Sequence, residues 1–241
     1  MKNKLFLFVM ALLLICNSAI AADTDTLTVR IKGMRCDDCA HKVMTAVTKD
    51  SGVEDIQFNL ERRTATIIYN PQVTSSDSIY ATLAATRRYK ATPYSPDERI
   101  RRGFGFRMDD MVSQADADRI VENLKNIQGV DSVGPNLNKR YAFIRYDANR
   151  TKKAEIRATL NSLGYTPVNF YTSDKVAFAY YDIKGKIPSQ DAIDEILTID
   201  AVDDVNVNAN KKTMAVTYFC EEITADQLNK AIRKAGIKVK R

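Results

Sequence analysis

The chain has 241 residues, of which 45% are hydrophobic and 27% are charged, with only 9 glycines and 6 prolines. This balance is typical of a globular protein and excludes an intrinsically disordered chain, a collagen-like chain and a polytopic membrane protein. The formal net charge of +6 is too small an excess to indicate a polyanionic partner by itself.

The first 22 residues are predicted to be a secretory signal peptide. Lys2 and Lys4 precede an apolar run over residues 5–15, and Ala19 and Ala21 form a small-x-small cleavage pattern. Cleavage removes both lysines and lowers the net charge from +6 to +4. The remaining sequence has no apolar run near the ~18 residues that span a bilayer. We therefore expect an exported protein, periplasmic or secreted, without membrane insertion after cleavage.

The rest of the chain contains an internal repeat. Residues 27–83 align with residues 104–160 without a gap, and a weaker third copy begins at Val176. Three units of roughly 70 residues account for nearly all of the exported chain. The identities between the first two copies include Gly52/Gly129, Val53/Val130, Asn59/Asn136, Leu60/Leu137, Arg63/Arg140 and Tyr69/Tyr146.

Each repeat is expected to contain six elements. In the first copy, apolar residues alternate over 27–31 and 56–60, as in half-buried strands, and follow helical spacing over 40–47. A third strand over 64–69, a helix around Ile79 and Leu83 and a last strand over 90–94 follow. The order βαββαβ is that of a split βαβ, ferredoxin-like unit. We predict an α+β chain of three tandem ferredoxin-like domains, over residues 25–95, 102–171 and 174–241.

The joints between the units are expected to be short connectors. Ser95–Arg102 and Thr172–Asp174 read as linkers, the first as a solvated connector. Pro93 predicts that the last strand of the first unit lies at a sheet edge, because proline cannot donate to a strand ladder.

Chemistry is concentrated in the segment from Gly33 to Cys39, between the first strand and the first helix. Cys36 and Cys39 are three residues apart, so their thiols can converge on one ion, and thiolates suit soft or borderline metals such as Cu(I) and Zn(II). The helix N-terminus is expected to lower the cysteine pKa. Met34 is expected to pack beneath the loop and hold it.

This segment resembles the heavy-metal-associated domain of copper chaperones, metal-pumping ATPases and periplasmic mercury-binding proteins. The family motif G-M-x-C-x-x-C is matched by Gly33, Met34, Cys36 and Cys39. The resemblance implies that the two cysteines hold one soft metal ion, with Cu(I) favoured over Zn(II), Cd(II) or Hg(II). It also implies a protein partner that donates or accepts the metal by ligand exchange.

The residues around the motif qualify this picture. The resemblance places Tyr89 near the metal, although Arg88 stands where the family usually has a glycine. Asp37 and Asp38 add hard oxygen ligands, which weakens the case for Cu(I) over Zn(II) or Cd(II), but we interpret them as solvated. His41 lies two positions after Cys39, about 200° around a helix, and is expected at the surface.

The equivalent loops of the other two units lack the cysteines. The second unit retains Met111 and has Ser113 and Asp116, which fit a capping box. The third has Gly185 and Pro188, and Pro188 suits the first turn of a helix. We therefore expect one metal site.

Cys220, just after a strand of the third unit, is expected to be a buried or edge thiol. An intermolecular disulfide or a transfer ligand stays open.

Two alternatives to a metal carrier remain. Cys36 and Cys39 could form a disulfide in an exported protein, leaving a protein-interaction scaffold of degenerate modules. The stretch Lys139–Tyr146 resembles an RNA-binding motif, except that Arg140 replaces a glycine. Tyr141 and Phe143 would stand on the open sheet face.

An exported protein rarely meets RNA, so we expect Tyr141 and Phe143 to pack against a neighbouring unit or a protein partner, and expect no nucleic-acid partner. A thioredoxin-like oxidoreductase does not fit the element order or the absence of tryptophan. The sequence shows no nucleophile–base pair and no phosphate loop, and we expect a protein that is not an enzyme.

Overall fold

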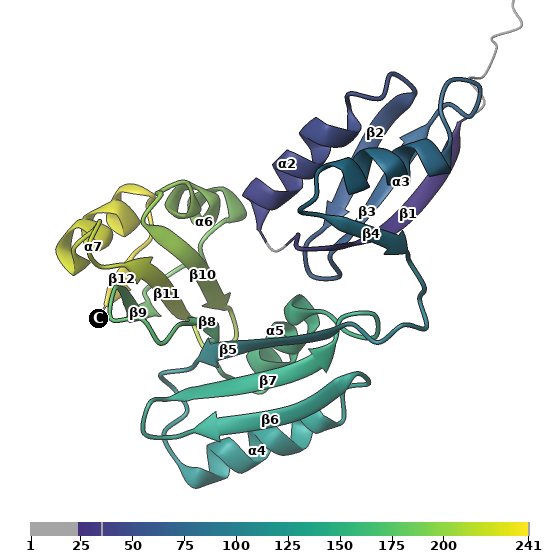
Figure 1. The fold of residues 1–241 in the computed structure, drawn as a ribbon. Coiled ribbons are helices and arrows are strands. Elements are labelled where there is room, and N and C mark those ends of the chain that lie inside the picture. Colours follow the sequence, from purple (N-terminus) through teal and green to yellow (C-terminus); the bar gives the residue numbers. More distant parts are fainter. Residues whose placement is uncertain (1–23, 35, 241) are drawn as a thin grey trace, which may run out of the picture. The chain divides into compact units, whose positions relative to one another are not determined.

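The computed structural model describes residues 24–34 and 36–240. The chain divides into two compact units, one ending at Ser95 and the other beginning at Pro96. The first unit contains one βαββαβ domain and the second contains two (Figure 1). The segment expected to be a signal peptide lies outside the described residues. Within the described part of the chain, every helix is too short or too polar to cross a membrane.

The first domain is a four-stranded antiparallel sheet with two helices, in the strand order β2-β3-β1-β4. Pro93 lies in β4 at the edge of this sheet, which confirms the expectation from its missing N–H group. The elements are β1 (Asp25–Lys32), α2 (Asp37–Val47), β2 (Val53–Asn59), β3 (Thr64–Tyr69), α3 (Ser76–Ala85) and β4 (Lys90–Pro93).

The core of the first domain lies between one sheet face and the two helices. Val29 and Ile31 of β1 and Ile67 of β3 are fully buried, as the alternation of apolar residues predicts. Val43 of α2 and Leu83 of α3 close the core from the helix side. The packing of α2 on the sheet therefore positions the start of this helix, where Cys39 lies.

The second domain repeats this arrangement in the order β6-β7-β5-β8. Strand β5 begins at Arg101, and Ile100 just before it is only 1% exposed. The expected linker Ser95–Arg102 is therefore shorter than the sequence suggested and is not fully solvated, because Ile100 is anchored in the domain. The elements are β5 (Arg101–Arg107), α4 (Gln114–Lys125), β6 (Val130–Asn136), β7 (Tyr141–Asp147), α5 (Lys153–Ser162) and β8 (Val168–Phe170).

The third domain follows after Thr172–Asp174 and has the order β10-β11-β9-β12. Three sheets of the same topology confirm the predicted α+β fold of tandem ferredoxin-like units. The elements are β9 (Val176–Ile183), α6 (Gln190–Leu197), β10 (Val202–Asn208), β11 (Thr213–Phe219), α7 (Ala225–Lys234) and β12 (Val239–Lys240).

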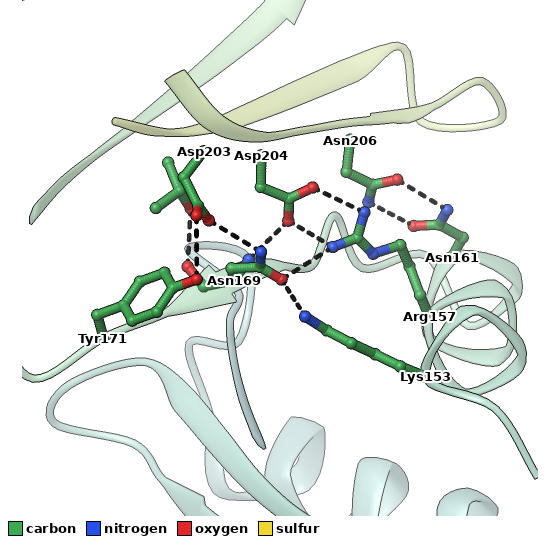
Figure 2. A network of polar contacts seen from close by, with 9 residues as sticks. Lys153, Arg157, Asn161, Asn169, Tyr171, Asp203, Asp204 and Asn206 are labelled. Atoms are coloured by element: carbon green, nitrogen blue, oxygen red, sulfur yellow. Dashed lines mark hydrogen bonds and ion pairs between the residues drawn. The ribbon is translucent and has the colours of Figure 1, made fainter. Parts of the chain in front are cut away.

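The second and third domains are joined by a network of polar side chains (Figure 2). Arg157 of α5 donates to both carboxylate oxygens of Asp204 in β10, and the backbone N–H of Asn169 donates to the same carboxylate at 2.8 Å. Asn161 and Asn206 exchange two amide hydrogen bonds of 2.9 and 3.2 Å. These bonds fix α5 and β8 against the open face of the third sheet.

Aromatic rings extend the same interface. Tyr141 stacks on Phe170 with ring centroids 4.1 Å apart, and Phe170 lies 5.8 Å from Phe178 of the third domain. Tyr141 thus packs within its own domain, and Phe170 makes the aromatic contact to the neighbour that we expected of Tyr141. Phe143 remains 42% exposed.

Candidate metal centre

The two cysteines of the first domain meet at the beginning of α2. Cys36 is the N-cap residue, with extended backbone angles, and its carbonyl accepts hydrogen bonds from the N–H groups of Cys39 (3.0 Å) and Ala40 (3.1 Å). This turn brings the two sulfur atoms to 2.8 Å from each other. Cys36 is exposed, whereas Cys39 is buried. The pair therefore has one sulfur accessible from solvent and one held against the core.

Gly33 and Met34 shape the loop in front of the cysteines. Gly33 has a φ of +93°, and a Cβ there would lie 3.1 Å from the carbonyl oxygen of Arg88. Only glycine takes this conformation without strain. Met34 is fully buried and its N–H donates to the carbonyl of Ile31, so the loop is anchored from below as expected.

Tyr89 lies beside this loop. Its ring is within 3.5 Å of the position that a Gly33 Cβ would occupy, and the residue is 4% exposed. Its buried hydroxyl makes no hydrogen bond of normal geometry to the described residues. Burial, and to a lesser extent the nearby thiol of Cys39, raises the pKa of the Tyr89 phenol, while the guanidinium of Arg88 opposes this. The fold thus brings Tyr89, 50 residues after Cys39 in the sequence, to the loop that carries Met34 and the cysteines.

The protonation of the Cys36 thiol differs from the sequence expectation. Its pKa is raised, first because its side chain shares a hydrogen bond with Cys39, and further by the charge of Asp38. The backbone N–H of Cys39 acts in the opposite direction, as expected at a helix N-terminus, but does not prevail. Two sulfurs in contact would repel each other if both were ionised, and this repulsion favours keeping a proton on the pair.

The remaining candidate ligands stand apart from the pair. Asp37, Asp38 and His41 are all exposed, which agrees with the solvated positions inferred from the sequence. Among the described residues, no group of three or more His, Cys, Asp or Glu side chains could hold a metal ion. The candidate centre is therefore a site of two sulfur ligands.

The same helix position in the other domains is occupied by serine. Ser113 accepts a hydrogen bond from the N–H of Asp116 at 3.2 Å, in the capping box that the sequence predicted. Ser189 accepts one from Ala192 at 3.3 Å. The Cys36 side chain caps none of the described N–H groups of α2. The first domain thus has a thiol where its two relatives have a helix-stabilising hydroxyl.

The register of β9 corrects the alignment of the third unit. Thr64 pairs with Arg30 in the first domain, whereas the equivalent Thr213 pairs with Asp182. Gly185, with a φ of +85°, therefore takes the place of Gly33 rather than of Cys36. Pro188 precedes the N-cap Ser189 and lies outside the first helical turn, contrary to our expectation. The signal that could have found Ser189 is its position before an amphipathic run, typical of an N-cap.

Cys220 is exposed in the turn after β11, an inner strand of its sheet, so it is neither the buried nor the edge thiol that we expected. Its sulfur lies 3.5 Å from the carbonyl oxygen of Asp174, and its N–H donates to Lys175. It lies in the second unit, whereas Cys36 and Cys39 lie in the first.

Comparison with known proteins connects this geometry to a family. The model of the heavy-metal-associated domain matches residues 28–87 and 106–166, which together make up half of the chain. The copper-exporting P-type ATPase of Bacillus subtilis (strain 168) is 23% identical over 139 residues, covering 58% of this chain and 16% of the ATPase. The human copper-transporting ATPase 2 is 34% identical over 58 residues, covering 24% of this chain and 4% of that ATPase. The chain thus spans only a small part of these relatives.

Solved structures include similar domains. The N-terminal soluble domains of Bacillus subtilis CopA are 22% identical and cover 64% of this chain and 98% of that chain, with a TM-score of 0.28. Oxidized MerP from Ralstonia metallidurans CH34 is 26% identical, and the match covers 30% of this chain and 99% of that chain, also with a TM-score of 0.28. The third domain lies outside both segments matched by the family model, although it repeats their topology. From the two matched domains, the chain belongs to the heavy-metal-associated domain family.

Proposed function

We propose that this protein is an exported, non-enzymatic carrier of one soft metal ion, which it sequesters or delivers through Cys36 and Cys39. The observation that carries the proposal is the convergence of the two sulfurs at the start of α2, one exposed and one buried. A cation between them would relieve the repulsion that keeps the pair protonated. The lysine-flanked apolar N-terminus supports export, to the periplasm or medium.

Cu(I) is the ion that this donor set suits best. Thiolates select soft cations, and a structural zinc site normally has four protein ligands. The described chain supplies two sulfurs without a third side-chain ligand. Zn(II) or Cd(II) would need further ligands from water or from a partner. The names of the related copper-exporting and copper-transporting ATPases support the same choice.

Delivery would proceed by ligand exchange with a donor or acceptor protein. A thiolate of the partner would form a bond to the metal as the bond to Cys36 breaks, and the leaving sulfur would take up a proton. Cys36 is the residue suited to this step because it is exposed, whereas Cys39 is held in the core. No electron is transferred, so Cu(I) would stay in the same oxidation state throughout.

A competition titration of anaerobically reduced protein tests the proposal. Cu(I) and, separately, Zn(II) are added against a chelator of known affinity, with the Cys36→Ser/Cys39→Ser variant alongside. Cys220→Ser is the matched control, because it removes an exposed thiol outside the pair. We expect one tight equivalent of Cu(I) that is lost in the double variant and kept in the control.

The converse results are equally informative. Zn(II) binding tighter than Cu(I) would refute the metal assignment. An absence of specific binding to the reduced protein would refute the carrier and favour the scaffold of degenerate modules with a Cys36–Cys39 disulfide.

A further inference from the structure

The second domain carries a groove of about 420 Å³ that takes no part in the metal centre. Its lining includes Gly103 and Gly105 of β5, Phe143 of β7 and Tyr171 beyond β8. Phe143 and Tyr171 are each 42% exposed, so the groove presents aromatic surface to solvent. The size is within the range of ligand-binding clefts.

The two glycines are what open this groove. A Cβ at Gly103 would lie 3.0 Å from the ring of Phe143, and a Cβ at Gly105 would lie 3.0 Å from the ring of Phe170. Side chains at either position would push the rings away from the strand. In the first domain the positions equivalent to Gly105 and Phe143 are Thr28 and Thr66, whose hydroxyls lie 3.3 Å apart and bond across the same strand pair. The first domain therefore lacks the aromatic floor of the second.

A free strand edge borders the groove. Strand β8 pairs with β5 only over Gly105–Arg107, so the described part of β5 over Arg101–Phe104 has no strand partner on that side. Unpaired backbone N–H and C=O groups at such an edge can pair with an added strand.

The charges around the groove are positive. Arg145 is exposed, and its guanidinium lies 5.8 Å from the ring centroid of Phe143. Lys153 lines the wall, with its ammonium 5.2 Å from the ring centroid of Phe104 and bonded to the Asn169 side chain. The ten lining residues include no acidic side chain. Asp203, which accepts the hydrogen bond of the Tyr171 hydroxyl at 3.0 Å, lies behind this ring and is also bonded by Asn169.

We propose that this groove is a docking site for an extended acidic segment of a partner protein. The segment would pair with the free edge of β5, set an aromatic or apolar side chain on Phe143 in the space left by Gly103, and place its carboxylates near Arg145 and Lys153. The free backbone edge favours a peptide over a nucleic acid, because an added strand satisfies both its donors and its acceptors.

The test uses the full chain and a short fluorescein-labelled peptide in which glutamate alternates with tyrosine and valine. Fluorescence anisotropy is measured for the wild type, Phe143→Ser and, as matched control, Val112→Ser. Val112 is 63% exposed in the same domain but outside the groove. Removal of an aromatic anchor should weaken binding by about tenfold or more, whereas the control should bind as the wild type does.

Further probes define the mode of binding. The peptide with lysine for glutamate should not bind, nor should one with proline at alternate positions, which cannot pair with an edge. Amide chemical shifts should change at Gly103 and Phe143, and thermal melting should show that each variant is folded. The affinity for Cu(I) should be the same with and without peptide. A failure of peptide binding would therefore leave the proposed carrier function intact.

Several results would overturn the proposal. These are absence of saturable binding, equal binding by Phe143→Ser, or equal binding of the lysine peptide. A thymidine oligonucleotide that displaces the peptide and binds more tightly would replace the protein partner with a nucleic acid.

Discussion

The ion pair between Arg157 and Asp204 is expected to hold the second and third domains together as one unit. Asp204→Ala removes the acceptor of two guanidinium hydrogen bonds and of the Asn169 N–H (Figure 2). The side chains of Arg157 and Asp204 are 23% and 11% exposed, so Arg157 would be left as a mostly buried, unpaired charge. Breaking a buried pair in this way costs ~3–5 kcal/mol, and partial exposure of Arg157 places our expectation near ~3 kcal/mol.

Urea unfolding, monitored by hydrogen exchange of individual peptides, measures the loss of unfolding free energy in each domain separately. Peptides of the second and third domains should lose protection in Asp204→Ala, while those of the first domain keep it. Glu221→Ala is the matched control, because it breaks an ion pair that lies at the surface. The side chains of Lys175 and Glu221 are 67% and 60% exposed. Such a surface pair should contribute less than about 1 kcal/mol.

A double-mutant cycle with Arg157→Met isolates the interaction. The double variant should lose about 1–3 kcal/mol less than the sum of the single losses, because the second substitution removes the charge that the first left unpaired. Strictly additive losses, or a loss from Asp204→Ala no larger than that of the control, would refute the reasoning that this pair joins the two domains.

Three further substitutions test local features. Gly33→Ala should destabilise the first domain by about 1–2 kcal/mol, because an alanine is strained at a φ of +93°, and a thermal melt beside Gly134→Ala, whose added Cβ would be 3.8 Å from its nearest neighbour, checks this. Ser113→Ala should cost about 1 kcal/mol in urea unfolding through the lost cap of α4, and Ser113→Thr should restore most of it. Burial raises the pKa of Asp110 above its ordinary value, so the folded protein favours the neutral carboxyl. The stability that this carboxyl contributes at low pH is therefore lost as pH rises through the raised pKa. Asp110→Asn should therefore flatten the fall in unfolding free energy that begins as pH rises above the ordinary carboxyl pKa of about 4, and an unchanged pH profile would contradict this assignment.

The sequence by itself determined the three-domain architecture and the location of the cysteine loop. Both depend on local patterns: alternating apolar residues define strands, helical spacing defines helices, and the repeat multiplies one domain into three. The capping box at Ser113 was also predictable, because a cap involves residues within one helical turn. The cysteine pair was visible for the same reason, since a spacing of three residues at a helix start brings the side chains together.

The tertiary structure alone decided what depends on contacts between distant segments. The insertion that shifts β9 relative to a gapless alignment became visible only in the pairing of Thr213 with Asp182. The raised pKa of Cys36 depends on a sulfur contact of 2.8 Å that helix position does not reveal. The exposure of Cys220, the Arg157–Asp204 joint and the groove beside Phe143 all follow from how whole elements pack. Local periodicity fixes which face of an element is apolar, but only packing fixes which other element covers that face and which side chains remain open to a partner.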